Sequence, residues 1–305
     1  MGGPRSAYFL APVPLWNQCW MFGMRYSWGV MPRMFNPFHG KKPGQHRSGP
    51  PRGDRPVERT SGPSHMASDP PIEIPGLELG TDFPLDAAVA KRLLLREVNP
   101  KEAFTAFDSA GAFFRVSVKE LTPAGGLAVP YELCAVSPEP TVNITLACAV
   151  LSRQRMLFVA QKATELGVSF LVPLLTEYSV KAADLAHEKA HGWPGQVLRA
   201  AKQCRRSSLP EVTPPMTFDG FLASAYAKAD LALCLDNVGG QTPAPAAPPE
   251  SVLLLVGPEG GFSDGERKKL EGRAMGWELG GRVLRAETAV LVGLAAVHLN
   301  WGDYR

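Results

Sequence analysis

The spacing of apolar residues changes twice along this chain of 305 residues. Residues 1–70 have no regular apolar spacing and are rich in Gly, Pro and Arg, as in segments that cannot bury a core. Residues 72–137 contain short runs in which apolar and polar positions alternate. Residues 141–305 contain continuous apolar runs separated by stretches with helical spacing. The pattern predicts a disordered extension followed by two folded domains.

Residues 72–137 predict a small domain made mostly of β-strands. In the stretch AFTAFDSAGAFFRVSVKEL, the residues Phe114, Val116 and Val118 alternate with polar residues, and an Asp-Ser-Ala-Gly turn separates two strands. A helix is expected just before this hairpin, at about residues 86–96.

Residues 141–305 predict an α/β domain in which helices cover a parallel sheet, because strands and helices alternate along the chain. Strands are expected at residues 141–151, 168–175, 230–236 and 251–257, and around residues 278–285. Helices are expected at residues 153–166 with Ser152 as the cap, 194–206, 218–229, from 264, and 287–299. The last helix is apolar enough to bury one face through Val290, Leu291, Leu294, Val297 and Leu299.

The stretch LLLVGPEGGFSDGE, residues 253–266, ends a buried strand with a glycine-rich loop. Gly257, Gly260 and Gly261 permit backbone angles and close approaches that a Cβ atom forbids. Ser263 and Glu266 have the spacing of a capping box, so a helix is expected to start here. In an α/β sheet, such a loop beyond the carboxyl end of a strand is a common ligand site.

The loop does not have the residues of a phosphate or dinucleotide site. It lacks the lysine of a phosphate-binding loop and the Gly-x-Gly-x-x-Gly spacing of a dinucleotide loop. Glu259 in its middle would repel phosphate groups. The loop therefore suits a neutral or cationic ligand, unless it is only a tight turn without a ligand.

A second loop, LGGRVLRAETAVL, combines two glycines with charged residues at a helix start. Arg282 and Arg285 precede Glu287 and Thr288; Glu287 suits the positive end of the helix dipole, and Thr288 can donate and accept hydrogen bonds. Alone, the segment could be a surface turn with solvated arginines. Two such loops in one domain favour a binding site.

Charge and cysteine content narrow the classes of function. The net charge is +3, with +7 over residues 1–65 and −4 over the rest, so a nucleic-acid partner must meet a local patch. The five cysteines form no Cys-x-x-Cys pair, and no expected helix carries a His-x-x-x-His pair, which argues against a disulfide framework or a metal site. No run of 18 apolar residues predicts a membrane span.

The basic extension has three interpretations. The favoured one is that translation starts at Met66, so that residues 1–65 are not part of the natural product. An organelle transit peptide and a basic RNA-binding tail are the alternatives.

Four stretches together resemble the RsmE family, the 16S rRNA (uracil-N3)-methyltransferases of the SPOUT superfamily. Two are LLVGPEGGFSDGE and LGGRVLRAETA; the others are QKATELGVSFLVPLLTEYS and LRAAKQCRRSSLPEV. The resemblance covers residues 141–300 well and residues 85–137 more weakly. The chain departs from the family pattern in the acidic stretch PIEIPGLELGTDFPL, at Ala90-Lys91-Arg92, in SRQRML and at Cys204.

The resemblance implies a C-terminal trefoil knot that binds S-adenosylmethionine (SAM), a small PUA-like RNA-binding domain and a homodimer. It implies N3 methylation of a uridine in small-subunit rRNA, in the cytoplasm or, if residues 1–65 are a transit peptide, in an organelle. The cofactor pocket it implies consists of Leu235, Gly257, Pro258, Glu259, Gly260, Leu279, Gly280, Arg282, Val283, Leu284, Arg285 and Thr288.

For catalysis, we expect a fixed cation to stabilise the uracil anion. Arg285 is the first candidate and Arg282 the second, while Glu287 is expected to orient an arginine. Arg285 could instead merely pair with Glu287. Expected RNA contacts are Arg92, Arg96, Arg115, Lys119, Lys162, Arg199, Lys202, Gln203, Arg205 and Arg206. Rival interpretations are another SPOUT RNA methyltransferase and a non-catalytic RNA-binding or ribosome-assembly protein.

Overall fold

A computed structural model describes residues 65–188, 190, 192–235, 240, 243–245 and 247–304. The predicted extension lies outside these described residues as far as residue 64.

The first sheet of the described chain is small and five-stranded, in the order β1-β3-β4-β5-β2. Its strands are β1 (Ile72–Glu73), β2 (Phe83–Leu85), β3 (Ala103–Phe107), β4 (Phe113–Thr122) and β5 (Gly125–Leu133). Helix α1 (Ala87–Leu95) starts after Asp86, whose carboxylate accepts a hydrogen bond of 2.7 Å from the Val89 amide. Val116 and Val118 lie in the buried core, as their alternation predicts. The predicted hairpin and helix are confirmed.

The second sheet has seven strands, and all of its pairings are parallel. The strand order is β12-β10-β11-β6-β7-β8, and β9 also pairs with β7. The strands are β6 (Asn143–Ala149), β7 (Phe170–Leu175), β8 (Glu211–Val212), β9 (Met216–Thr217), β10 (Leu231–Leu235), β11 (Ser251–Val256) and β12 (Met275–Trp277). Parallel strands place their carboxyl ends at one edge, so the loops that follow them meet there.

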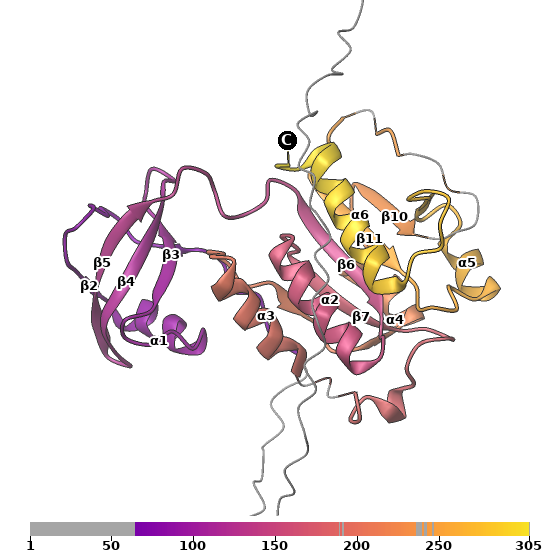
Figure 1. Ribbon diagram of the computed structural model, residues 1–305, viewed down its shortest axis with the longest axis horizontal. Helices are drawn as coiled ribbons and strands as arrows, with labels where there is room; N and C mark the ends of the chain where they lie inside the picture. The colour runs from indigo at the N-terminus through magenta and orange to yellow at the C-terminus, as the bar shows by residue number, and fades with distance from the viewer. Residues whose placement is uncertain are drawn as a thin grey trace, which may run out of the picture. The chain divides into compact units, whose positions relative to one another are not determined.

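Helices cover both faces of this second sheet. Alternate residues of β11 point to opposite faces: Leu254 joins the core beneath α2, α3 and α6, and Leu253 joins the core beneath α4 and α5. Figure 1 shows α6 crossing β11 and β6, with α2 beside it. The helices are α2 (Arg153–Glu165), α3 (Gly192–Gln203), α4 (Phe218–Ala223), α5 (Asp264–Leu270) and α6 (Ala286–Trp301), with 3-10 turns at Ala182–Asp184 and Ala225–Ala227. The predicted α/β class is confirmed.

Four local predictions need correction. The strand expected around residues 278–285 is a loop, since β12 ends at Trp277 and Gly280 takes φ +124°. The helix expected at 218–229 ends at Ala223, where the Ser224 hydroxyl donates to a carbonyl of the helix. Ser152 stands at the start of α2 but makes no side-chain cap bond. Leu299 is exposed, although Val290, Leu294 and Val297 are buried as expected.

Candidate functional site

A pocket lies at the carboxyl edge of the large sheet, where β10, β11 and β12 end. Nine of the twelve predicted pocket residues line it: Leu235, Gly257, Pro258, Glu259, Leu279, Gly280, Arg282, Val283 and Leu284. The lining also includes Val256, Gly261, Trp277, Ala286 and Ala289, which were not among the twelve predicted pocket residues. Three predicted residues do not line the pocket, although residues close to them in sequence do: Gly260, Arg285 and Thr288.

The glycines of the first loop make room for other parts of the protein. A Cβ on Gly257 would lie 3.2 Å from the Gly261 backbone and 3.3 Å from the Phe262 ring. A Cβ on Gly260 would lie 3.1 Å from the Cβ of Tyr178. Gly261 has φ +72°, a backbone conformation that L side chains rarely adopt. Internal packing therefore accounts for these three glycines.

Two carboxylates hold the first loop in place. Glu266 completes the predicted capping box, because its carboxylate accepts from the Ser263 amide at 2.9 Å and the Ser263 hydroxyl accepts from the Glu266 amide. The other oxygen of Glu266 accepts from the Glu177 amide, also at 2.9 Å, and so ties the loop after β7 to the loop after β11. Glu259 forms an ion pair with Arg155 of α2. The positive charge of Arg155 offsets the negative charge of Glu259, which was the reason to expect that the loop repels phosphate.

The second loop presents two exposed cations. Arg282 and Arg285 are exposed, and neither forms a hydrogen bond through its side chain or an ion pair with any residue that the structure describes. Arg285 occupies the N-cap position of α6. The possible Arg285–Glu287 pair is therefore not seen, and neither is the predicted orientation of an arginine by Glu287.

Glu287 carries a buried side-chain oxygen. Its Oε2 atom has no hydrogen bond to any of the residues that the structure describes. Burial, which is the larger effect, and the nearby Glu287 carboxylate together raise the pKa of the Cys148 thiol to about 12. Cys148 pairs with Val256 across β6 and β11, and Val256 lines the pocket. Glu287 thus acts electrostatically on the carboxyl ends of these central strands.

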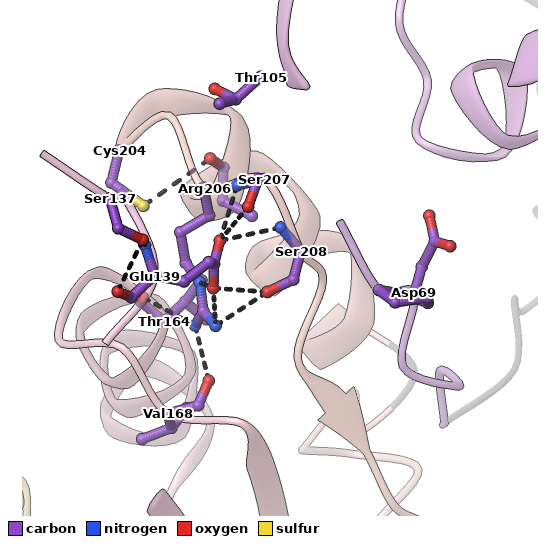
Figure 2. A network of polar contacts seen from close by, with 12 residues as sticks. Asp69, Thr105, Ser137, Glu139, Thr164, Val168, Cys204, Arg206, Ser207 and Ser208 are labelled. Atoms are coloured by element: carbon purple, nitrogen blue, oxygen red, sulfur yellow. Dashed lines mark hydrogen bonds and ion pairs between the residues drawn. The ribbon is translucent and has the colours of Figure 1, made fainter. Parts of the chain in front are cut away.

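The segment after α3 holds other predicted site residues, and it forms a network of internal bonds (Figure 2). Arg206 donates to Glu139 at 2.9 Å and to the Val168 carbonyl at 2.6 Å, and its side chain is 5% exposed. The second oxygen of Glu139 accepts from the Ser207 and Ser208 amides. Burial would raise the pKa of Glu139, but the Arg206 charge and the bonds from Ser208 hold it below its ordinary value.

The same segment bonds to the small sheet and to the chain that precedes it. The Ser207 carbonyl accepts from Arg96 at 2.6 Å, and the Arg205 carbonyl accepts from the Thr105 hydroxyl at 2.8 Å. Residues 66 and 69 pair antiparallel with residues 212 and 209. We call residues 202–212 the junction segment, because they bond to both sheets and to the chain on either side of the small sheet.

Three predicted RNA contacts are buried, so the prediction for them needs correction. Arg96, Arg115 and Arg206 are 4%, 7% and 8% exposed. Arg96 also binds Asp69, and burial lowers the pKa of its guanidinium against the opposing effect of Asp69. Arg115 donates to the Thr105 hydroxyl. Buried guanidinium groups that serve internal acceptors are not available to RNA.

The other predicted RNA contacts are more accessible, although five of them have carboxylate partners. The pairs are Arg92–Asp69, Lys119–Asp82, Lys162–Glu165, Lys202–Glu102 and Arg205–Glu132. Arg199 and Gln203 are exposed and have no carboxylate partner among the described residues. Pairing reduces the net positive charge that this group of side chains offers to a phosphate backbone.

The described residues contain no group of three or more His, Cys, Asp or Glu side chains that could hold a metal ion. Within the same part of the chain, no helix has both the length and the apolar character needed to cross a membrane.

A family model for an RNA methyltransferase domain matches residues 137–298, which is more than half of the chain. The matched range contains the complete large sheet and the loops that line the pocket. The class of protein that this fold and pocket define is therefore an RNA methyltransferase domain.

Curated relatives narrow the class further. The chain is 31% identical over 205 residues to Ribosomal RNA small subunit methyltransferase E of Synechocystis, covering 65% of this chain and 66% of the relative. It is 31% identical over 168 residues to the protein of that name from Aquifex aeolicus, covering 53% of this chain and 70% of the relative. The chain belongs to the family of ribosomal RNA small subunit methyltransferase E, as the sequence motifs predicted.

Solved structures agree with this assignment. A methyltransferase from Legionella pneumophila in complex with SAM is 31% identical, with a TM-score of 0.55 over 76% of this chain and 98% of that one. A ribosomal RNA small subunit methyltransferase E from Neisseria gonorrhoeae, bound to SAM, is 26% identical, with a TM-score of 0.55 over 78% of this chain and 100% of that one.

Proposed function

We propose that this protein is a SAM-dependent methyltransferase that methylates N3 of a specific uridine in small-subunit (16S) rRNA. The observation that carries the proposal is the pocket at the carboxyl edge of the large sheet, where nine residues implied by the sequence motifs lie together. Relatives named as small-subunit rRNA methyltransferases and neighbours that hold SAM support the substrate and the cofactor.

The apolar lining and loop backbone of the pocket support SAM as the ligand. Apolar side chains such as Leu235 and Leu279, together with loop backbone, suit the adenine ring and its polar edge. Glu287 lies in the chain between Ala286 and Ala289, which line the pocket, so its carboxylate places a negative charge near a bound cationic group. When bound, SAM supplies the methyl group for transfer. We propose that Glu287 helps to balance the sulfonium charge; Glu287→Gln should then weaken SAM binding about tenfold in calorimetry.

The contribution of this chain to catalysis is an arginine whose positive charge stabilises the substrate anion. Uracil N3 carries a proton, and it becomes a good nucleophile only when that proton leaves. The resulting anion is shared between N3 and two carbonyl oxygens. We propose that Arg285 stabilises it, with Arg282 as the second candidate, because neither guanidinium is committed to an internal partner in the described chain.

The organisation that accompanies this activity is also a proposal. We assign residues 72–137 to a PUA-like RNA-binding domain and residues 141–305 to a SPOUT domain with a trefoil knot, acting as a cytoplasmic homodimer. Residues 1–70 are proposed as an extension outside both. The accessible side chains Arg199 and Gln203, together with the paired cations, remain candidates for RNA contact.

The test uses the full chain with SAM and small ribosomal subunits that lack the modification. We expect N3-methyluridine by mass spectrometry and one new primer-extension stop, since an N3 methyl group blocks Watson–Crick pairing. A methyl group on another atom would favour the rival SPOUT methyltransferase. Absence of both product and SAM binding would favour the non-catalytic ribosome-assembly protein.

A further inference from the structure

The turn that follows β7 places an aromatic ring beside the glycine loop. A Cβ on Gly260 would lie 3.1 Å from Cβ, 3.2 Å from Cδ2 and 3.3 Å from Cγ of Tyr178. The Tyr178 side chain therefore packs directly on the loop backbone, and any side chain at position 260 would displace it. Gly260 is next to Glu259, which lines the pocket.

The ring is exposed although its backbone is held firmly. Tyr178 is 52% exposed, and its hydroxyl has no hydrogen bond to any residue that the structure describes. The Ser179 hydroxyl accepts from the Thr176 amide at 2.9 Å, and Glu266 accepts from the Glu177 amide at 2.9 Å. These bonds order the turn that carries Tyr178, so little backbone freedom is lost when a partner covers the ring.

We propose that Tyr178 is a stacking platform for an unpaired base of the RNA substrate at the rim of the pocket. A half-exposed aromatic ring on an ordered turn beside a methyl-transfer pocket is suited to a base that has been turned out of its helix, because proteins hold such bases by stacking. Stacking needs an aromatic face, and the hydroxyl is not required. This inference rests on the proposed function and assigns Tyr178 a positioning role.

Two substitutions at the same position separate stacking from simple volume. Tyr178→Phe keeps the ring and is expected to keep KM for small subunits within about twofold. Tyr178→Leu keeps apolar volume against Gly260 but removes the aromatic face, so KM should rise about 10- to 100-fold. The dissociation constant for SAM should stay within about twofold in both variants, because the ring is assigned to RNA. Equal KM values for both variants and the unchanged protein would overturn the proposal.

A crosslink gives a readout that does not depend on activity. Small-subunit rRNA that contains 5-iodouridine is bound to the full chain and irradiated. The crosslinked peptide is then identified by mass spectrometry. A crosslink at Tyr178 supports the stacking role, even where the unchanged protein forms no N3-methyluridine and the proposed function fails. Weakened SAM binding by Tyr178→Leu would instead assign the ring to the cofactor, and a changed oligomeric state would assign it to a subunit interface; either result overturns the proposal.

Discussion

Two regions of this molecule are rich in arginine, and they use it in opposite ways. At the pocket, Arg282 and Arg285 are exposed and have no partner among the described residues. In the junction segment, Arg206 is buried and bonds to Glu139 and the Val168 carbonyl. Both regions belong to motifs that resemble the same family, yet the charge of Arg206 is committed to internal partners, whereas Arg282 and Arg285 are exposed to a ligand.

The difference shows that the exposure of an arginine in these motifs decides whether it stabilises the fold or is available to a ligand. A buried guanidinium is retained only where carbonyl and carboxylate groups satisfy its donors, and these bonds fix the structure around it. An exposed guanidinium without a partner contributes little to stability and is free to meet an anion. The comparison predicts that substitutions at the junction will change folding, whereas substitutions at the pocket will change turnover.

The largest effect on stability is expected at Arg206. Arg206→Ala leaves the Glu139 carboxylate buried beside an empty space, so the free energy of unfolding should fall by about 3–5 kcal/mol. Urea unfolding followed by circular dichroism measures the loss. Adding Glu139→Gln removes the unpaired charge and should restore part of the stability. A loss below about 1 kcal/mol for Arg206→Ala would mean that the buried pair is not a structural anchor.

Arg285 should show the reverse behaviour. Arg285→Ala is expected to lower turnover about 100- to 1000-fold, because the uracil anion loses its cation. The free energy of unfolding should change by less than about 0.5 kcal/mol, since the side chain is exposed. Arg273→Ala removes an exposed arginine of the same domain and serves as the control. Turnover equal to that of the unchanged protein would remove Arg285 from the mechanism.

Acid should weaken the junction through Glu139. Because the folded protein lowers the pKa of Glu139, its contribution to stability is complete above the ordinary value of 4.5 and is lost as pH falls through the lower folded value. Glu139→Gln lacks this contribution at every pH, so its stability should fall less steeply below pH 4.5. Glu102→Gln is the control, since the pKa of Glu102 is also lowered but its side chain is 41% exposed. Parallel curves for Glu139→Gln and the unchanged protein would contradict the assignment.

Sequence patterns predicted the features that depend on nearby residues. The α1 helix, the β3–β4 hairpin and the Ser263–Glu266 capping box follow from local spacing, and the parallel sheet follows from the order of the elements. The strand expected around residues 278–285 is absent because its apolar residues line a pocket loop in which Gly280 takes a positive φ.

Features that depend on distant residues could not be read from the sequence. Arg206 and Glu139 are 67 positions apart, and Arg96 and the Ser207 carbonyl are 111 positions apart. No local spacing in the sequence connects such pairs, so Arg96 and Arg206 were predicted to contact RNA. The glycine loop lies between β11 and α5 as predicted, but the atoms that approach Gly260 belong to Tyr178, which lies far earlier in the chain.

The smallest effect is expected at Arg205, where the usual ranking of alanine and glycine should reverse. Arg205 has φ +64°, which is unfavourable for any residue with a Cβ, and its ion pair with Glu132 is exposed. Both Arg205→Ala and Arg205→Gly remove that pair, at a cost of less than about 1 kcal/mol, and both keep the carbonyl that accepts from Thr105. Only glycine relieves the backbone, so Arg205→Gly should be the more stable variant by about 1 kcal/mol in urea unfolding. If the alanine variant is more stable, backbone strain at the end of α3 does not set the energy of this position.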